Sequence, residues 1–135
     1  MQFRADASGS IAAIRFYKGA TNTGPHFGHL WTSSGRLLAT VRFTNETASG
    51  WQEARLATPV AVAANATYVV SYYTTAGNYA ADDDYFGVAV NSGPLHAPAS
   101  GAAAGNGVYR YGLSGFPTES YQSTNYWVDV VFTTP

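Results

Sequence analysis

Apolar and polar residues alternate along much of the chain, which is the pattern of β-strands that bury one face. The alternation predicts four longer strands, at residues 10–18, 37–43, 67–73 and 125–132. Segments rich in β-branched and aromatic residues predict shorter strands at residues 30–32, 51–56, 60–62, 86–90 and 108–111. Residues 1–6 also have the character of a strand that is already under way. Helical periodicity is nearly missing, so we expect an all-β protein.

Turn residues separate these segments. Ser33-Ser34-Gly35 lies between Trp31 and Leu37, in the position and with the chemistry of a hairpin turn. Eight to nine short strands separated by such turns predict an antiparallel β-sandwich of the jelly-roll or immunoglobulin-like type. The apolar faces predict these core residues: Ile14, Phe16, Val41, Phe43, Val70, Val128, Val130 and Phe132.

Length and composition narrow the function classes. The 135 residues are one domain's worth of chain, and only 11% of them are charged. A net charge of −1 excludes a nucleic-acid binder that works by neutralising phosphates. No run of 18 apolar residues is present, so we expect no membrane insertion. Without cysteine there is no disulfide, thiolate metal site or cysteine nucleophile.

The chain has no internal linker or repeat, so residues 1–135 are expected to form a single module. No basic stretch followed by an apolar segment opens the sequence, and no signal peptide is visible. The first residues begin inside a strand, and Thr133-Thr134-Pro135 stands where a linker would start. We therefore expect a module excised from a longer, secreted multidomain protein.

Six ordered segments together carry a family resemblance: residues 14–19, 22–31, 43–52, 106–112, 116–118 and 125–132. They resemble the bacterial family catalogued as domain of unknown function 4082, over almost the whole chain. The resemblance implies an accessory module of large secreted or surface proteins. Such modules stand beside immunoglobulin-like and fibronectin-like domains, and some accompany carbohydrate-active enzymes. It assigns no binding residue.

Three adjacent carboxylates, Asp82, Asp83 and Asp84, make up much of the chain's acidic content. Calcium takes six to eight oxygen ligands, and like charges this close repel unless a cation or solvent relieves them. The spacing is not that of an EF-hand. These residues are a candidate calcium site, and a solvated loop in which one aspartate caps a turn is the alternative.

Aromatic residues are the second chemical signal. Sugar-binding modules stack the C–H faces of pyranose rings on exposed side chains and bind the hydroxyls with polar groups. Each tryptophan taken singly is better explained by core packing. Loop residues are better candidates for a binding surface, since loops carry function on sandwiches. The predicted ligand-binding residues are Asn78, Tyr79, Tyr85 and Tyr121.

Lysine and histidine give weaker hypotheses. Lys18, the one lysine, is a candidate for a cross-link to Asn125 or Asp129, with a solvated strand-end lysine as the alternative. His26 and His29 are expected in a loop, where hydrogen bonding is a better explanation than metal binding.

Catalytic patterns are missing, so we expect no enzyme. There is no Gly-x-Ser-x-Gly elbow and no identifiable triad. The function predicted is a non-catalytic extracellular accessory module for a polysaccharide or cell-surface glycan, secreted or on a bacterial cell surface. The alternative is a structural spacer or adhesion domain that contacts only neighbouring domains of its parent chain.

Overall fold

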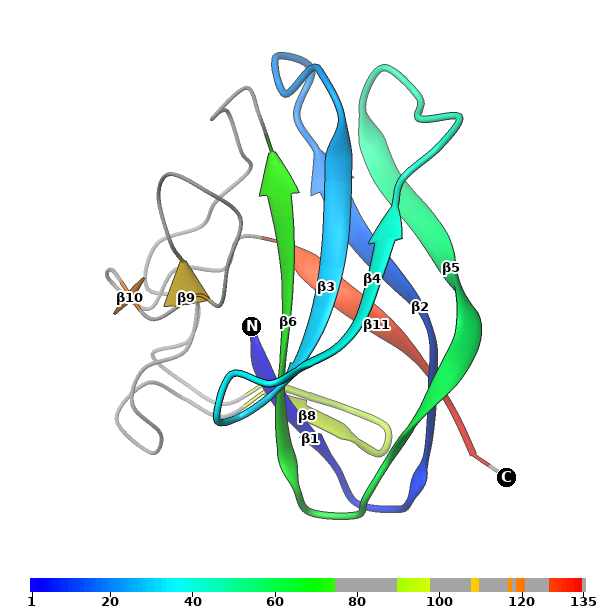
Figure 1. Ribbon diagram of the computed structural model, residues 1–135, viewed down its shortest axis with the longest axis vertical. Helices are drawn as coiled ribbons and strands as arrows, with labels where there is room; N and C mark the ends of the chain where they lie inside the picture. Colours follow the sequence, from blue (N-terminus) through cyan, green and yellow to red (C-terminus); the bar gives the residue numbers. More distant parts are fainter. Residues whose placement is uncertain (75–89, 98–107, 110–116, 118, 121–126, 135) are drawn as a thin grey trace.

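A computed structural model of the chain describes residues 1–74, 90–97, 108–109, 117, 119–120 and 127–134. Within these ranges all regular structure is β-strand (Figure 1). The strands are β1 (Gln2–Ala5), β2 (Gly9–Lys18), β3 (His26–Thr32), β4 (Leu37–Arg42), β5 (Gly50–Val62), β6 (Thr67–Thr74), β7 (Val90–Ser92), β8 (Leu95–Ala97), β9 (Val108–Tyr109), β10 (Glu119–Ser120) and β11 (Val128–Thr133).

Two antiparallel sheets pack face to face and confirm the predicted β-sandwich (Figure 1). The larger sheet has the strand order β4-β3-β6-β1-β8-β7, and the smaller has the order β11-β2-β5. The pair β9–β10 stands apart from both. The long strands β2 and β5 run together over almost their whole length, from Gly9 opposite Val62 to Lys18 opposite Gly50.

The core lies between the inner faces of these two sheets. Phe16, Ile14 and Leu30 are fully buried, and Phe16 packs against Tyr72 and Phe43 with ring centroids 4.6 and 4.7 Å apart. Six of the eight predicted core residues are buried, while Val41 and Phe132 are partly buried against the same cluster. Burial of this kind of apolar area is the main stabilising term in such a domain.

Turn chemistry matches the sequence at the predicted hairpin. The amide of Gly35 donates to the carbonyl of Thr32 at 3.1 Å, and Gly35 has a φ of 96°. This φ lies in the left-handed region, which glycine enters at no steric cost. A second turn joins β5 to β6 at residues 63–66, where Asn65 adopts a φ of 61°.

Several strand predictions need correction. The described ranges contain eleven strands rather than eight or nine, because short pairings at residues 95–97 and 119–120 carry no periodic signal. The two predicted segments 51–56 and 60–62 form one strand, β5, whose pairing with β2 shifts register at a bulge. None of the described residues forms a helix of the length and apolarity needed to cross a membrane.

Candidate ligand-binding face

An aromatic row crosses the outer face of the smaller sheet at one end. Tyr17 of β2 lies directly opposite Trp51 of β5, and these rings are 41% and 45% exposed. The amide of Tyr17 donates to the carbonyl of Trp127 at 2.8 Å, which places Trp127 beside Tyr17 on the other side of β2. The Trp51 indole has its centroid 5.7 Å from Tyr17 and 6.4 Å from Trp127. Tyr17, Trp51 and Trp127 are called the aromatic row below.

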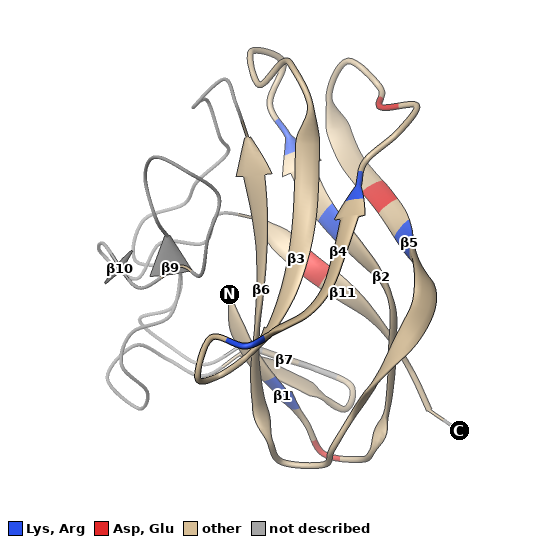
Figure 2. Cartoon of the chain, viewed as in Figure 1, with Lys and Arg blue, Asp and Glu red and all other residues tan. Residues whose placement is uncertain are grey.

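A charged row lies next to the aromatic row, two residues along each strand. Arg15 of β2 stands opposite Glu53 of β5 on one side and Asp129 of β11 on the other. The guanidinium of Arg15 donates to Asp129 at 2.9 Å and lies 5.0 Å from the centre of the Trp51 ring. Figure 2 shows these charged positions on β2, β5 and β11. Asp129, Arg15 and Glu53 are called the charged row.

The backbone at the edge of this face is strained. Trp127 has a φ of 55°, which places a bulky side chain in the left-handed region. Such a conformation costs on the order of 1–2 kcal/mol and is uncommon for a residue with a large side chain. Strained residues of this kind cluster at functional sites, so the conformation of Trp127 supports the hypothesis that this edge of the sheet is functional.

A buried polar cluster lies on the inner side of the same sheet end. His26 and Asn22 are fully buried, and Lys18 and Gln52 are almost so. The Nδ1 of His26 is 2.8 and 2.9 Å from the two carboxylate oxygens of Glu46, and its Nε2 is 2.8 Å from the Asn22 Oδ1. The ammonium of Lys18 lies 3.2 Å from Glu46 and donates to the carbonyl of Thr47 at 3.1 Å.

Gln52 fastens the segment that leads into β5. Its amide nitrogen donates to the Thr47 hydroxyl at 2.7 Å and to the Gly50 carbonyl at 3.1 Å, while its oxygen accepts from the Thr47 amide at 2.9 Å. The buried cluster thus holds both the end of β2 and the start of β5. These are the two strand ends that carry Tyr17 and Trp51 on the other side.

Comparison with known proteins gives one match, to a family model. The family model described as "Domain of unknown function (DUF4082)" matches residues 1–128. The chain belongs to the DUF4082 family. The resemblance drawn from the sequence is therefore confirmed. No curated protein and no solved structure gives a significant match.

The DUF4082 assignment carries no site with it, so the site rests on the geometry of this chain. The predicted ligand-binding residues Asn78, Tyr79, Tyr85 and Tyr121 lie outside the described residues. So do the predicted calcium ligands Asp82, Asp83 and Asp84. Both hypotheses stay predictions. Among the residues that are described, no group of three His, Cys, Asp or Glu is placed to hold a metal ion.

The expectation for the tryptophans was right for one and wrong for another. Trp31 is buried and donates from its indole nitrogen to the Ser71 hydroxyl at 2.9 Å. Trp51 is exposed, because it follows Gly50 at the start of a strand whose odd-numbered residues face outward there. The signal was present in the sequence: Arg15 and Tyr17, like Trp51 and Glu53, occupy the polar phase of their strands.

The Lys18 hypothesis also needs correction. Asp129 pairs with Arg15 on the outer face, whereas Lys18 points inward to Glu46, so Asp129 is not its partner. The second suggested partner, Asn125, lies outside the described residues. The alternative of a solvated ammonium is wrong as well, because the Lys18 side chain is buried beside a carboxylate.

The histidines lie in strands rather than in a loop. His26 and His29 belong to β3, where a separation of three residues places side chains on opposite faces. Burial lowers the pKa of His29, which favours its neutral form. This geometry does not bring the two imidazoles together at a metal.

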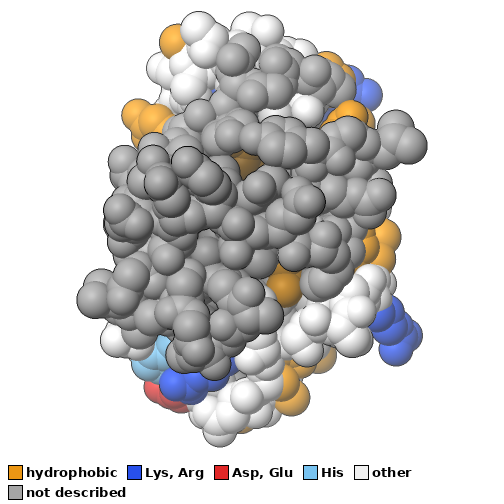
Figure 3. Space-filling view, turned by 90° about the vertical axis from the view of Figure 1, so that its left-hand side faces the viewer, with side chains coloured by type: hydrophobic (Ala, Val, Ile, Leu, Met, Phe, Trp, Pro, Cys, Tyr) orange, Lys and Arg blue, Asp and Glu red, His pale blue; other side chains and the backbone are white. Residues whose placement is uncertain are grey.

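A second polar group lies at strands β1 and β8 of the larger sheet, whereas the aromatic row lies on the smaller sheet. His96 Nε2 is 2.7 Å from Asp6, and Arg4 is 3.3 Å from the same carboxylate. Figure 3, which views the molecule from the left-hand side of Figure 1, shows basic, acidic and histidine side chains together at its lower left. The hydrogen bond from His96, followed by the charges of His96 and Arg4, holds the pKa of Asp6 below its usual value. The group is a surface ion-pair network.

Proposed function

We propose that this DUF4082 domain is a non-catalytic extracellular accessory module of a bacterial protein, and that it binds carbohydrate through the aromatic row. The observation that carries the proposal is the pair of exposed rings, Tyr17 and Trp51, beside the charged row. Large exposed apolar side chains in a cluster mark interaction sites on soluble domains. Rings offer apolar area for the C–H face of a sugar at low entropic cost.

The charged row supplies the polar half of such a site. Carboxylates accept hydrogen bonds from neighbouring hydroxyls, and charge-assisted bonds of this type are the stronger ones. A few fixed polar groups beside an apolar surface orient a ligand. Arg15 is itself held in place by Asp129 and Trp51, so the row is ordered before any ligand arrives. A site formed by side chains on the open face of a sheet is expected to be weak, with a dissociation constant of about 1 mM per domain.

The alternative is a structural spacer or adhesion domain whose aromatic row packs against a neighbouring domain of the same parent chain. Trp, Tyr and Arg are also the residues most enriched at the centres of protein interfaces. Binding to isolated polysaccharides separates the two functions, because a spacer retains none.

The test is affinity electrophoresis against soluble plant, fungal and bacterial polysaccharides. We expect the wild-type chain to be retarded by at least one of them, and the Tyr17→Ala/Trp51→Ala variant to migrate freely. Leu37→Ala is the matched control, since Leu37 is 47% exposed on the larger sheet. This variant should bind polysaccharide as the wild type does. Failure of the wild type to be retarded by any polysaccharide overturns the proposal in favour of the spacer.

A further pair of substitutions locates the site. Tyr79→Ala/Tyr85→Ala tests the predicted loop surface in the same gel. If that variant loses binding while Tyr17→Ala/Trp51→Ala keeps it, then carbohydrate binding stands but the aromatic row is not the site.

A further inference from the structure

We infer that the ligand is an uncharged glycan that is bound as a single polysaccharide chain, and not as the flat surface of a crystalline polymer. The inference rests on the proposed function and names the ligand class of the same face. Two features of the face carry it: the angles between the rings, and the charges beside them.

The rings of the aromatic row stand nearly at right angles. The planes of Tyr17 and Trp51 make an angle of 86°, and those of Trp51 and Trp127 make an angle of 80°. A crystalline polysaccharide presents a plane of sugar rings, and binding it needs aromatic rings that lie flat in one plane. Perpendicular neighbours instead form a corner, in which one sugar stacks on one ring and meets the second ring along its edge.

The spacing of the two rows fits one sugar unit. They are separated by two residues along each strand, or about 6.6 Å at roughly 3.3 Å per residue. A sugar stacked in the corner can therefore direct its hydroxyls to Arg15, Asp129 or Glu53. A single polysaccharide chain that approaches the sheet from solvent can both stack in the corner and reach these polar groups.

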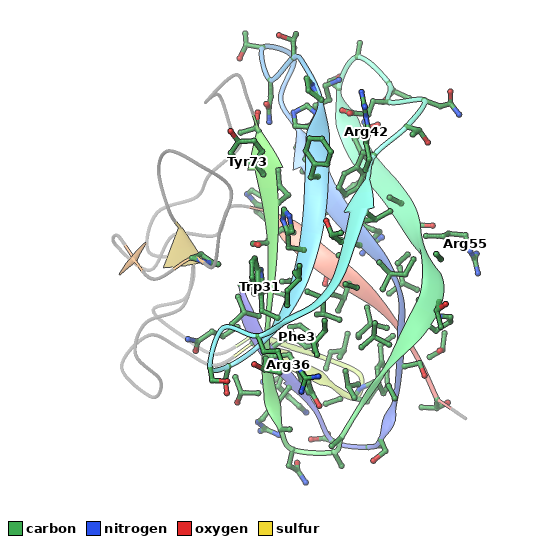
Figure 4. All side chains as sticks on the ribbon, viewed as in Figure 1. Phe3, Trp31, Arg36, Arg42, Arg55 and Tyr73 are labelled. Atoms are coloured by element: carbon green, nitrogen blue, oxygen red, sulfur yellow. The ribbon has the colours of Figure 1, made fainter. Side chains whose placement is uncertain are left out.

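The charges select against acidic sugars. The positive charge of Arg15 is already engaged by Asp129 and by the Trp51 ring. Glu53 is exposed and makes no ion pair within the described part of the chain. Arg55 lies one step further from the rings and projects away from the sandwich (Figure 4). Next to the rings, an incoming carboxylate therefore meets the two negative charges of Asp129 and Glu53 and the single positive charge of Arg15, so the net charge of the charged row repels it.

Two matched sets of polymers test the inference by affinity electrophoresis and by sedimentation with insoluble material. One set is hydroxyethylcellulose, carboxymethylcellulose and microcrystalline cellulose, and the other is glycol chitin, carboxymethyl chitin and crystalline chitin. We expect binding to a neutral soluble chain and no retention on its crystalline form. Binding to the carboxymethylated chain should be about fivefold weaker at low salt, and the difference should shrink as salt is added.

Glu53→Gln is the decisive variant. It should restore most of the binding to the carboxymethylated chain, whereas Asp6→Asn, which alters an exposed carboxylate on the larger sheet, should not. Retention on crystalline material, equal or better binding to the acidic chain, or failure to bind either neutral soluble chain would each overturn the inference. The proposed function survives those results if another polysaccharide is bound through the aromatic row, and it fails if none is bound.

Discussion

Tyr17 and Lys18 are neighbours in sequence, as are Trp51 and Gln52, yet the members of each pair lie on opposite sides of one sheet. At this end of the sandwich the usual arrangement is reversed, with aromatic rings in solvent and polar groups in the core. Elsewhere along β2, Ile14 and Phe16 point inward and Arg15 points outward in the ordinary way. Buried polar groups and exposed large rings are the informative departures from core packing. Both departures occur at the same strand ends, with a structural polar cluster inside and the proposed binding surface outside.

The largest expected effect belongs to the inner side. Glu46→Gln removes the carboxylate that Lys18 and His26 share, and leaves a buried ammonium without its counter-charge. Breaking a buried pair in this way typically costs about 3–5 kcal/mol. The measurement is the free energy of unfolding in urea. Glu53→Gln makes the same chemical change on the outer face and should stay within about 0.5 kcal/mol of wild type. Equal losses for both variants would contradict the contrast drawn between the two sides.

The amino group of Met1 sharpens the comparison, because it is buried with no carboxylate beside it in the described part of the chain. The amino group of Met1 donates to the carbonyl of Val70 at 2.6 Å, and burial lowers its pKa to about 5. In the unfolded chain this pKa is close to 8. Between pH 5 and 8 the unfolded state therefore binds more protons, so stability rises with pH across that window by up to about 4 kcal/mol. Outside the window this group contributes no slope.

Nα-acetylated protein is the control for that prediction. It keeps every histidine and carboxylate but has no amine to titrate, so its stability should change less between pH 5 and 8. Unfolding free energies measured at several pH values for both forms give the difference. Parallel curves would show that the amine is solvated in the folded chain.

A smaller effect is expected for the aromatic row. Tyr17→Ala or Trp51→Ala removes an edge-to-face pair worth about 0.5–1.5 kcal/mol and leaves no cavity in the core. Each variant should therefore lose about 1 kcal/mol by urea unfolding, while the proposed carbohydrate binding should be lost altogether. A loss as large as that of Glu46→Gln would indicate that the rings are structural.

The smallest effect is expected for the ion pair of the charged row. Asp129→Asn breaks a pair whose two side chains are more than a third exposed. Such pairs contribute about 0–1 kcal/mol, and salt screens them. The stability difference from wild type should be within this range and should fall further in 1 M salt. A larger loss that persists in high salt would place Asp129 with the buried groups.

The sequence predicted the fold because period-two alternation is visible in four of the longer strands. β2, β4, β6 and β11 were all located, and Phe16 and Val130 were assigned to the correct face. The short strands β8 and β10 were missed, since two or three residues are too few to show a period. His26 was misplaced because neighbouring Gly and Pro residues suggested a loop, whereas long-range pairing with β4 and β6 extends β3 to include it.

The candidate site was less predictable, for a definite reason. Alternation assigns Tyr17 and Trp51 to the outer face, but only the register between β2 and β5 shows that they are directly opposite each other. Lys18 and Glu46 are 28 positions apart, and nothing local in either segment indicates their pairing. Residue spacing alone favoured the cluster of carboxylates and tyrosines at residues 78–85, which is local and therefore visible in a sequence.

The position of Lys18 has a practical consequence for chemical labelling. It is the single lysine of the chain, and its ammonium lies beside Glu46 in the interior, while the amino group of Met1 is buried against β6. Reagents that acylate amines, including common fluorescent dyes and surface-coupling chemistries, consequently find no freely accessible target on the folded domain. The rate of acylation at neutral pH therefore measures how often the sandwich opens, since each amine reacts only when its own region is exposed. Mass spectrometry of the partly labelled protein would then report separately on the β1–β6 pair in the middle of the larger sheet and on the end that carries the aromatic row.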